Sequence, residues 1–241
     1  MNDIDEKLEK EIESFQNLWR GGTTLSRQGW GVCAQDRLRY GIDINKIYEI
    51  CIEPFVGGKT TALDIGTNGG GWLKKMLNAE ALIGIDVLSA EHTGFWKNMP
   101  ELNKIKYYHV DDFSCDCLKE NSIDYVFSYD VFCHISYSGA EQYLKNLYDK
   151  LKKGTNCFIM IADADKYKDE HGKVKLTKYA GFNDWQSFVE DYDGPPHRGR
   201  WYLYGTERFC DLLKKYNYTL VNKDVIGEYS INCPIIHFRK D

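Results

Sequence analysis

Apolar positions in the middle of the chain fall into short runs that amphipathic stretches separate. Runs of apolar and β-branched residues with the length of buried strands occur at 60–65, 81–86, 107–113, 125–129 and within 151–163. Helical spacing appears between them, in a helix that begins at Trp72 and in another around residues 90–99. Strands that alternate with helices are typical of βαβ units, so the pattern predicts an α/β fold with a mainly parallel sheet.

The C-terminal part of the chain changes pattern. The capping box that begins at Ser138 predicts the start of one helix, and Thr206 predicts the cap of another. Two final runs, 218–226 and 230–238, read as strands joined at Gly227-Glu228. Because a parallel pair needs a crossover of about a dozen residues or more, these two strands must form an antiparallel hairpin.

The N-terminal part is predicted to be helical. Apolar residues recur at spacings of three and four in the first twenty residues: Ile4, Leu8, Ile12, Phe15 and Leu18/Trp19. This amphipathic helix either packs on the main domain or forms a lid or a homodimer face. A glycine-rich connector follows at 20–31, and Asp43 is a suitable N-cap for a helix that ends at Gly57-Gly58.

Four glycines lie within six residues directly after the first predicted strand, at Gly66, Gly69, Gly70 and Gly71. Such a turn lets the backbone N–H groups of a helix N-terminus approach a ligand closely. The dinucleotide fingerprint G-x-G-x-x-G fits no register of these glycines, so NAD is not expected. A P-loop is not expected either, because the tripeptide 58–60, Gly-Lys-Thr, precedes the strand and does not follow it.

The turn reads D-x-G-x-N-x-G at Asp64, Gly66, Asn68 and Gly70, which resembles motif I of the class I S-adenosylmethionine-dependent methyltransferases, D/E-x-G-x-G-x-G. Asn68 departs from the motif, but asparagine tolerates the left-handed backbone well. Later segments resemble the family's other motifs in order, and the resemblance covers residues 60–163. It implies a Rossmann-like, seven-stranded, mostly parallel sheet with a C-terminal antiparallel hairpin and helices on both faces, and S-adenosyl-L-methionine as cofactor.

The resemblance also implies roles for individual residues. Asp86, 20 positions after Gly66 at the end of the second strand, would accept from both ribose hydroxyls. Asp112 would bind the adenine amino group, and the Phe113 N–H would bind a ring nitrogen. The full set expected to bind the cofactor is Asp64, Gly66, Thr67, Asn68, Gly70, Asp86, Val87, Asp112, Phe113 and Ser128.

Methyl transfer requires the protein to position the acceptor and, for a hydroxyl, to remove a proton. His134 lies just past the fourth strand and is a candidate base, although the family often carries a histidine here that is not required as one. Asp130 would orient His134, act as base itself or help to hold a cation. His197 is a third catalytic candidate, in the loop Gly-Pro-Pro-His-Arg-Gly-Arg at 194–200.

Acceptor recognition is assigned to the segment 164–205, which is rich in polar and aromatic residues and lacks a strand pattern. Arg198 and Arg200 could hold an anionic group, and Trp201 could line the same site. The alternative is a solvated basic loop within a purely structural excursion. The expected organisation is one methyltransferase domain, 1–241, with an N-terminal helical cap (1–56), a cofactor-binding half (57–163), a substrate-cap insertion (164–205) and a final helix and hairpin (206–241).

The amino-acid composition of the chain limits which binding partners are expected. The net charge of −5 argues against a nucleic-acid partner, because phosphate recognition needs a basic face. The absence of a long apolar run argues against a membrane span, and a charged N-terminus without a signal core favours the cytoplasm. Eight scattered cysteines, of which only Cys115 and Cys117 lie close together, favour free thiols, and no metal site is expected.

Together these observations favour O-methylation of a small polar acceptor such as a sugar, a glycan precursor or a phosphorylated metabolite. N-methylation of a small amine is one alternative. A non-catalytic module that binds the cofactor and regulates a partner is the other.

Overall fold

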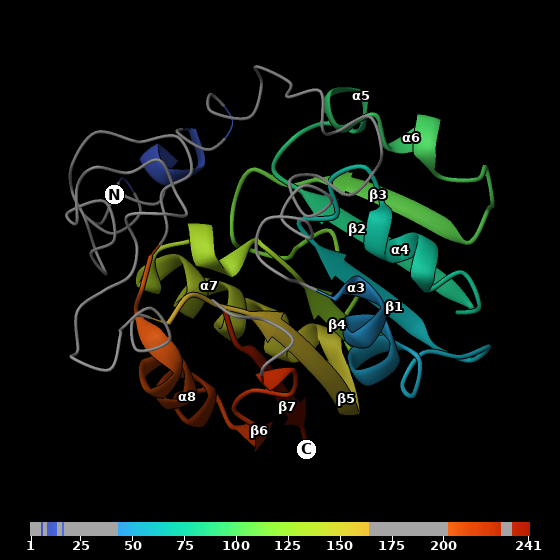
Figure 1. The fold of residues 1–241 in the computed structure, drawn as a ribbon. Helices are drawn as coiled ribbons and strands as arrows, with labels where there is room; N and C mark the ends of the chain where they lie inside the picture. The colour runs from blue at the N-terminus through green and yellow to red at the C-terminus, as the bar shows by residue number, and fades with distance from the viewer. Residues whose placement is uncertain (1–5, 7–8, 14–15, 17–42, 164–201, 228–232) are drawn as a thin grey trace.

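The structure, a computed structural model, describes residues 6, 9–13, 16, 43–163, 202–227 and 233–241. Its centre is a seven-stranded sheet with the strand order β3-β2-β1-β4-β5-β7-β6 (Figure 1). The strands are β1 (Thr61–Ile65), β2 (Ala81–Asp86), β3 (Ile105–His109), β4 (Ile123–Ser128), β5 (Leu151–Met160), β6 (Tyr218–Asn222) and β7 (Ile235–Lys240). Strands β1 to β5 are parallel, and β7 runs antiparallel to both β5 and β6. The predicted sheet and its antiparallel end are confirmed.

Successive side chains along the central strands point to opposite faces of the sheet and belong to two separate hydrophobic cores. Ala62, Tyr125 and Phe158 contribute to one core, whereas their neighbours Leu63 and Val126 contribute to the other. Because helices cover both faces of the parallel strands, both sets of side chains are buried, and the strands read as continuous apolar runs. This explains why these strands were recognisable in the sequence.

The first core packs under helices from the N-terminal half. These are α3 (Ile44–Ile47), the π-helical turn η2 (Tyr48–Ile52), α4 (Gly71–Lys75), and α5 (Ala90–Thr93) and α6 (Phe95–Asn98), which divide at Gly94. The side chain of Asp43 caps α3 as predicted, accepting from the Asn45 and Lys46 N–H groups at 3.0 and 3.2 Å. Gly94 has a left-handed φ of 67°, so it ends α5 and precedes α6. The single helix expected at 90–99 is therefore divided into two.

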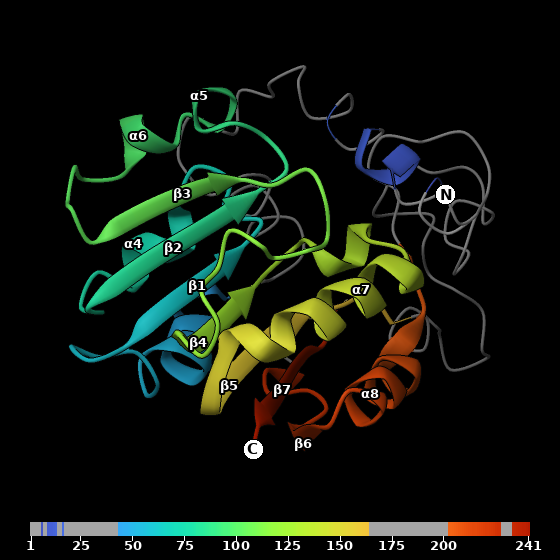
Figure 2. The same ribbon diagram turned by 180° about the vertical axis from the view of Figure 1, so that it is seen from behind.

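The second core packs under α7 (Tyr137–Leu147) and α8 (Gly205–Lys215), on the opposite face of the sheet (Figure 2). Short turns η3 (Phe132–His134) and η4 (Tyr148–Lys150) flank α7. Leu144 and Leu147 of α7 and Phe209 of α8 are fully buried there. The expectation of helices on both faces is confirmed.

Several predicted boundaries differ from those of the structure. Strand β3 ends at His109, not at 113, because its last ladder bond joins the Val110 N–H to the Asp86 carbonyl at 2.8 Å. Helix α7 is capped by Ser136, whose hydroxyl accepts from the Gly139 N–H at 3.1 Å, and not by Ser138. Thr206 is not a cap, because α8 already begins at Gly205; among the described residues, β6 ends at Asn222 and β7 begins at Ile235.

The N-terminal helix and the insertion are only partly described. Residues 9–13 are helical, as predicted for this region, and the candidates His197, Arg198, Arg200 and Trp201 lie outside the described residues. In the part of the chain that the structure describes, no helix is long and apolar enough to span a membrane.

Candidate functional site

The glycine turn after β1 approaches its neighbours too closely for side chains. Gly66 has φ +73°, and a Cβ placed on it would lie 2.1 Å from a methyl group of Val131. Asn68 also adopts the left-handed conformation, at φ 48°, as expected for the residue that replaces glycine in the motif. The Gly66 and Thr67 N–H groups donate to the Ile85 carbonyl at 2.8 and 3.1 Å, which fastens the turn to the end of β2.

Asp86 lies at the carboxyl end of β2 beside this turn. It is 8% exposed, and its two carboxylate oxygens accept from different backbone groups: the Asn68 N–H at 2.8 Å and the Leu88 N–H at 2.9 Å. Burial raises the pKa of this carboxyl. A carboxylate has about four acceptor positions, so these two bonds orient the group and leave acceptor capacity for a ligand's hydroxyls.

Polar atoms that are buried without a partner gather at the same turn. Within the described residues, Asp64 Oδ2, Thr67 Oγ1 and Asn68 Oδ1 have no hydrogen-bond partner. Burial, opposed in part by the Thr67 side chain and assisted by the charge of Asp86, raises the pKa of the Asp64 carboxyl to about 8. Each unsatisfied group costs about 1–3 kcal/mol, which a polar ligand with hydroxyl and ammonium donors would recover. The turn therefore has the donor and acceptor character of a cofactor site.

The remaining residues expected to bind the cofactor lie at or just after the carboxyl ends of β2, β3 and β4. Asp112 is exposed beyond β3, where its Oδ1 accepts from the Ser114 N–H and hydroxyl at 3.0 and 2.8 Å. Phe113 is buried, and the Val87 carbonyl accepts from the His109 imidazole at 3.0 Å. The Ser128 hydroxyl donates to the Ile65 carbonyl at 3.0 Å, so this side chain ties β4 to β1.

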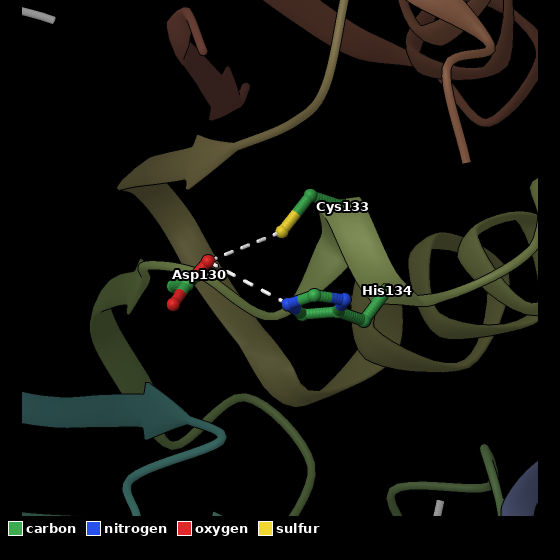
Figure 3. Close-up of side chains that lie close together, drawn as sticks. All are labelled: Asp130, Cys133 and His134. Carbon is green, nitrogen blue, oxygen red and sulfur yellow. Dashed lines mark hydrogen bonds and ion pairs between the residues drawn. The ribbon is translucent and has the colours of Figure 1, made fainter. Parts of the chain in front are cut away.

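Asp130, Cys133 and His134 converge just past the end of β4 (Figure 3). Asp130 Oδ1 lies 3.6 Å from His134 Nε2 and 3.5 Å from Cys133 Sγ. Asp130 has φ 60°, which turns the chain back so that η3 faces it. The predicted pairing of Asp130 with His134 thus has a geometric basis.

Residues at the C-terminal end of the insertion hold η3 in place. The Tyr202 N–H donates to the Cys133 carbonyl at 2.8 Å, and the Tyr204 hydroxyl donates to the Phe132 carbonyl at 2.9 Å. Asp163, at the end of β5, accepts from the N–H and the hydroxyl of Thr206 and so caps α8. The chain segments at the two ends of the insertion therefore meet at the edge of the sheet that carries the candidate catalytic residues.

Sequence reasoning missed three residues of this region. Cys133 lies beside the candidate catalytic residues Asp130 and His134, but a single cysteine inside an apolar run carries no signal of its own. The Glu11 carboxylate accepts from the Ser136 N–H at 2.7 Å and from its hydroxyl at 2.6 Å, and Gln16 donates to the Val87 carbonyl at 3.4 Å. These contacts join the N-terminal segment to the start of α7 and to the end of β2, and only the folded chain shows them.

The site lies at the carboxyl edge of the sheet between β1 and β4, where the strand order reverses direction. Open α/β sheets bind their ligands at such a switch point. With the antiparallel β7, the glycine turn after β1 and the acid after β2, the fold and the site define the class I methyltransferase architecture.

The chain belongs to the methyltransferase family. The family model described as a methyltransferase domain matches residues 35–223, which is most of the chain. The protein is therefore an S-adenosylmethionine-dependent methyltransferase, and the predicted family, enzyme class and cofactor are confirmed. No curated protein sequence matches the chain significantly.

Solved structures with the same fold are similar over most of the chain. An S-adenosylmethionine-dependent methyltransferase from Aquifex aeolicus has a TM-score of 0.56 and 18% identity, covering 84% of this chain and 92% of its own. The N-methyltransferase NodS from Bradyrhizobium japonicum has a TM-score of 0.54 and 14% sequence identity, and the match covers 81% of this chain and 93% of NodS. A third structure is an N-methyltransferase from Haemonchus contortus in complex with phosphomonomethylethanolamine and S-adenosylhomocysteine. It has a TM-score of 0.60 and 17% sequence identity, and the match covers 94% of this chain and 60% of that protein. At these identities the similarity shows the fold.

Proposed function

We propose that the protein transfers the methyl group of S-adenosylmethionine to a hydroxyl oxygen of a small polar acceptor. One observation carries this proposal: the turn that bears Asp130 and His134 packs directly on the cofactor turn, through the close approach of Val131 to Gly66. A group that removes an acceptor proton must lie beside the reacting methyl group. The contact supports such a placement of this pair.

The proposed cofactor residues are those that surround the turn. Asp86, oriented by two backbone N–H groups, accepts from the ribose hydroxyls, and the buried acceptors of Asp64, Thr67 and Asn68 face the polar part of the cofactor. Bound S-adenosylmethionine supplies an electrophilic methyl group on a positively charged sulfur. We assign the adenine end to Asp112 and the Phe113 N–H, as the family resemblance implies.

In the proposed reaction the acceptor oxygen attacks the methyl carbon as the carbon–sulfur bond breaks. The new O–CH3 bond uses an oxygen lone pair, the sulfur keeps the electrons of the broken bond, and the hydroxyl proton leaves. In this proposal the Asp130–His134 pair, with Asp130 Oδ1 3.6 Å from His134 Nε2, receives that proton. His197 remains a further candidate from the insertion.

The acceptor class we propose is a sugar, a glycan precursor or a phosphorylated metabolite. Its support is the composition of the insertion, in which Arg198 and Arg200 would bind an anionic group and Trp201 would pack against the acceptor. The cap role of residues 164–205 belongs to the same proposal.

A turnover assay tests the proposal. Purified protein is supplied with S-adenosylmethionine and a panel of sugars, phosphorylated metabolites and amines, and S-adenosylhomocysteine production is measured. Hydroxyl acceptors should react, and His134→Ala should reduce kcat by roughly 10²–10⁴-fold, the usual contribution of a positioned acid or base. The control is His92→Ala, on the exposed surface of α5, which should retain activity. Transfer to no hydroxyl acceptor would refute O-methylation.

N-methylation of a small amine is the second candidate. Its support is the presence of two N-methyltransferases among the structures that share this fold. A neutral amine is already a nucleophile, so proton removal matters less. In that case amines should react in the same panel, and His134→Ala should leave the rate nearly unchanged.

A further inference from the structure

The cluster formed by Asp130, Cys133 and His134 combines three kinds of metal-ligating atom. A carboxylate oxygen, a thiol sulfur and an imidazole nitrogen all lie within 4.8 Å of one another (Figure 3). Cys133 and His134 are buried, whereas the Asp130 side chain is 18% exposed. The site is thus largely closed to water but open on one side. We infer that this cluster binds one Zn²⁺ ion.

The distances within the cluster are compatible with coordination of a shared metal ion. A charge-assisted N–H···O bond is about 2.7–2.9 Å long, and the separation of 3.6 Å between His134 Nε2 and Asp130 Oδ1 is well beyond it. Tetrahedral zinc with bonds of about 2.0–2.3 Å places its ligand atoms roughly 3.3–3.8 Å apart. The nitrogen–oxygen distance of 3.6 Å and the sulfur–oxygen distance of 3.5 Å lie in that range, and the sulfur and nitrogen atoms lie within 4.8 Å of each other.

The kinds of ligand atom in the cluster indicate which metal ion it would bind. A thiolate and an imidazole favour Zn²⁺ over Mg²⁺ or Ca²⁺, which prefer all-oxygen sites. Three protein ligands with a fourth position left for water or substrate are the pattern of catalytic zinc sites, whereas structural sites use four. On binding, Cys133 loses its thiol proton to solvent, so the site takes the metal as a thiolate, a carboxylate and a neutral imidazole.

The backbone prepares the cluster without long-range rearrangement. All three ligands lie within five residues, on the turn with Asp130 at φ 60° and on η3. The Tyr202 N–H and the Tyr204 hydroxyl fix the carbonyls of Cys133 and Phe132, which limits the movement of the two ligands on η3. The spacing 130, 133, 134 differs from the paired spacing of zinc motifs, which is why sequence reasoning expected no metal site.

A metal here deepens the proposed function and rests on it. With His134 Nε2 on zinc, the imidazole is not free to act as a base, and the metal takes over the handling of the acceptor proton. The acceptor hydroxyl occupies the fourth position, where zinc draws electron density from the oxygen and favours loss of its proton to water. The oxygen then forms the O–CH3 bond as the S–CH3 bond breaks.

Metal titration tests the inference. Protein stripped with a chelator is titrated with Co²⁺, a spectroscopic substitute for Zn²⁺, and then with Zn²⁺ in competition. We expect one equivalent of Co²⁺ to produce a thiolate charge-transfer band and intense visible bands of tetrahedral cobalt. Cys133→Ser should abolish the charge-transfer band, and Asp130→Asn should weaken Zn²⁺ binding by at least about 100-fold, beyond the 10–100-fold that outer partners contribute.

The matched control is Cys210→Ser, the same chemical change at a half-buried cysteine on α8, outside the site. It should leave the spectrum and the affinity unchanged. An equal charge-transfer band in wild type and Cys133→Ser, or no stoichiometric binding to wild type, would overturn the zinc site. Two measurements on the same samples separate the two proposals: calorimetry of S-adenosylmethionine binding, and the turnover assay with and without chelator. Cofactor binding and chelator-insensitive O-methylation would overturn only the metal, whereas failure to methylate hydroxyls, with zinc bound, would overturn the proposed function alone.

Discussion

Replacing Asp64 with asparagine should remove a pH dependence from the stability of the cofactor-free protein. The Asp64 side chain is 1% exposed, and burial raises the pKa of its carboxyl to about 8. In the unfolded chain the same group has a pKa of about 3.9. Between those two values the native protein holds a proton that the unfolded chain has released, so the free energy of unfolding falls as pH rises.

The size of the effect follows from the two pKa values. Each pH unit is worth about 1.4 kcal/mol while the native group stays protonated, and the slope lessens near pH 8. Between pH 6 and pH 8 the Asp64 carboxyl should therefore cost the native state roughly 2 kcal/mol. Asp64→Asn keeps the shape and cannot ionise, so this loss should disappear and the variant should gain stability relative to wild type as pH rises.

Urea unfolding of both proteins without cofactor, at pH 6, 7 and 8, measures the difference. Other groups titrate in this range in both proteins, so the change in the difference between their unfolding free energies reports Asp64. The exposed Asp211 on α8 supplies a control, Asp211→Asn, which should follow wild type. Parallel pH profiles for wild type and Asp64→Asn would show that the buried carboxyl is already ionised at pH 6 and would refute the reasoning.

Three further changes test other parts of the site. Asp86→Ala should weaken S-adenosylmethionine binding by roughly 1.5–3 kcal/mol, the range for a hydrogen bond to a charged group, as calorimetry can measure; unchanged affinity would remove Asp86 from the site. Gly66→Ala should destabilise the fold more than Gly154→Ala in thermal unfolding, because both glycines have positive φ but only Gly66 meets a neighbour at 2.1 Å; equal losses would contradict the close approach. Replacing Arg198 and Arg200 together with alanine should raise the acceptor KM and leave donor affinity unchanged, whereas a fall in donor affinity would place this loop over the cofactor.

The sequence by itself determined the elements whose pattern is local. Strand β2 has the predicted bounds, because an apolar run that is buried on both faces and ends in an acid is legible without its neighbours. The left-handed Asn68 was likewise predictable, since backbone sterics depend on the residue itself and on the turn around it. The position of Asp86 as the last residue of this strand therefore followed from the chain alone.

Tertiary structure decided which distant groups meet. Ser136 caps α7 and also binds Glu11, 125 residues away, and β3 ends where its register with β2 runs out, not where its apolar run ends. The turn of Asp130 toward η3 and the loss of solvent around Asp64 likewise required the packed molecule. A sequence pattern reports the burial and backbone preference of one short segment, whereas the distances and the hydration on which the chemistry depends arise only when separate segments pack together.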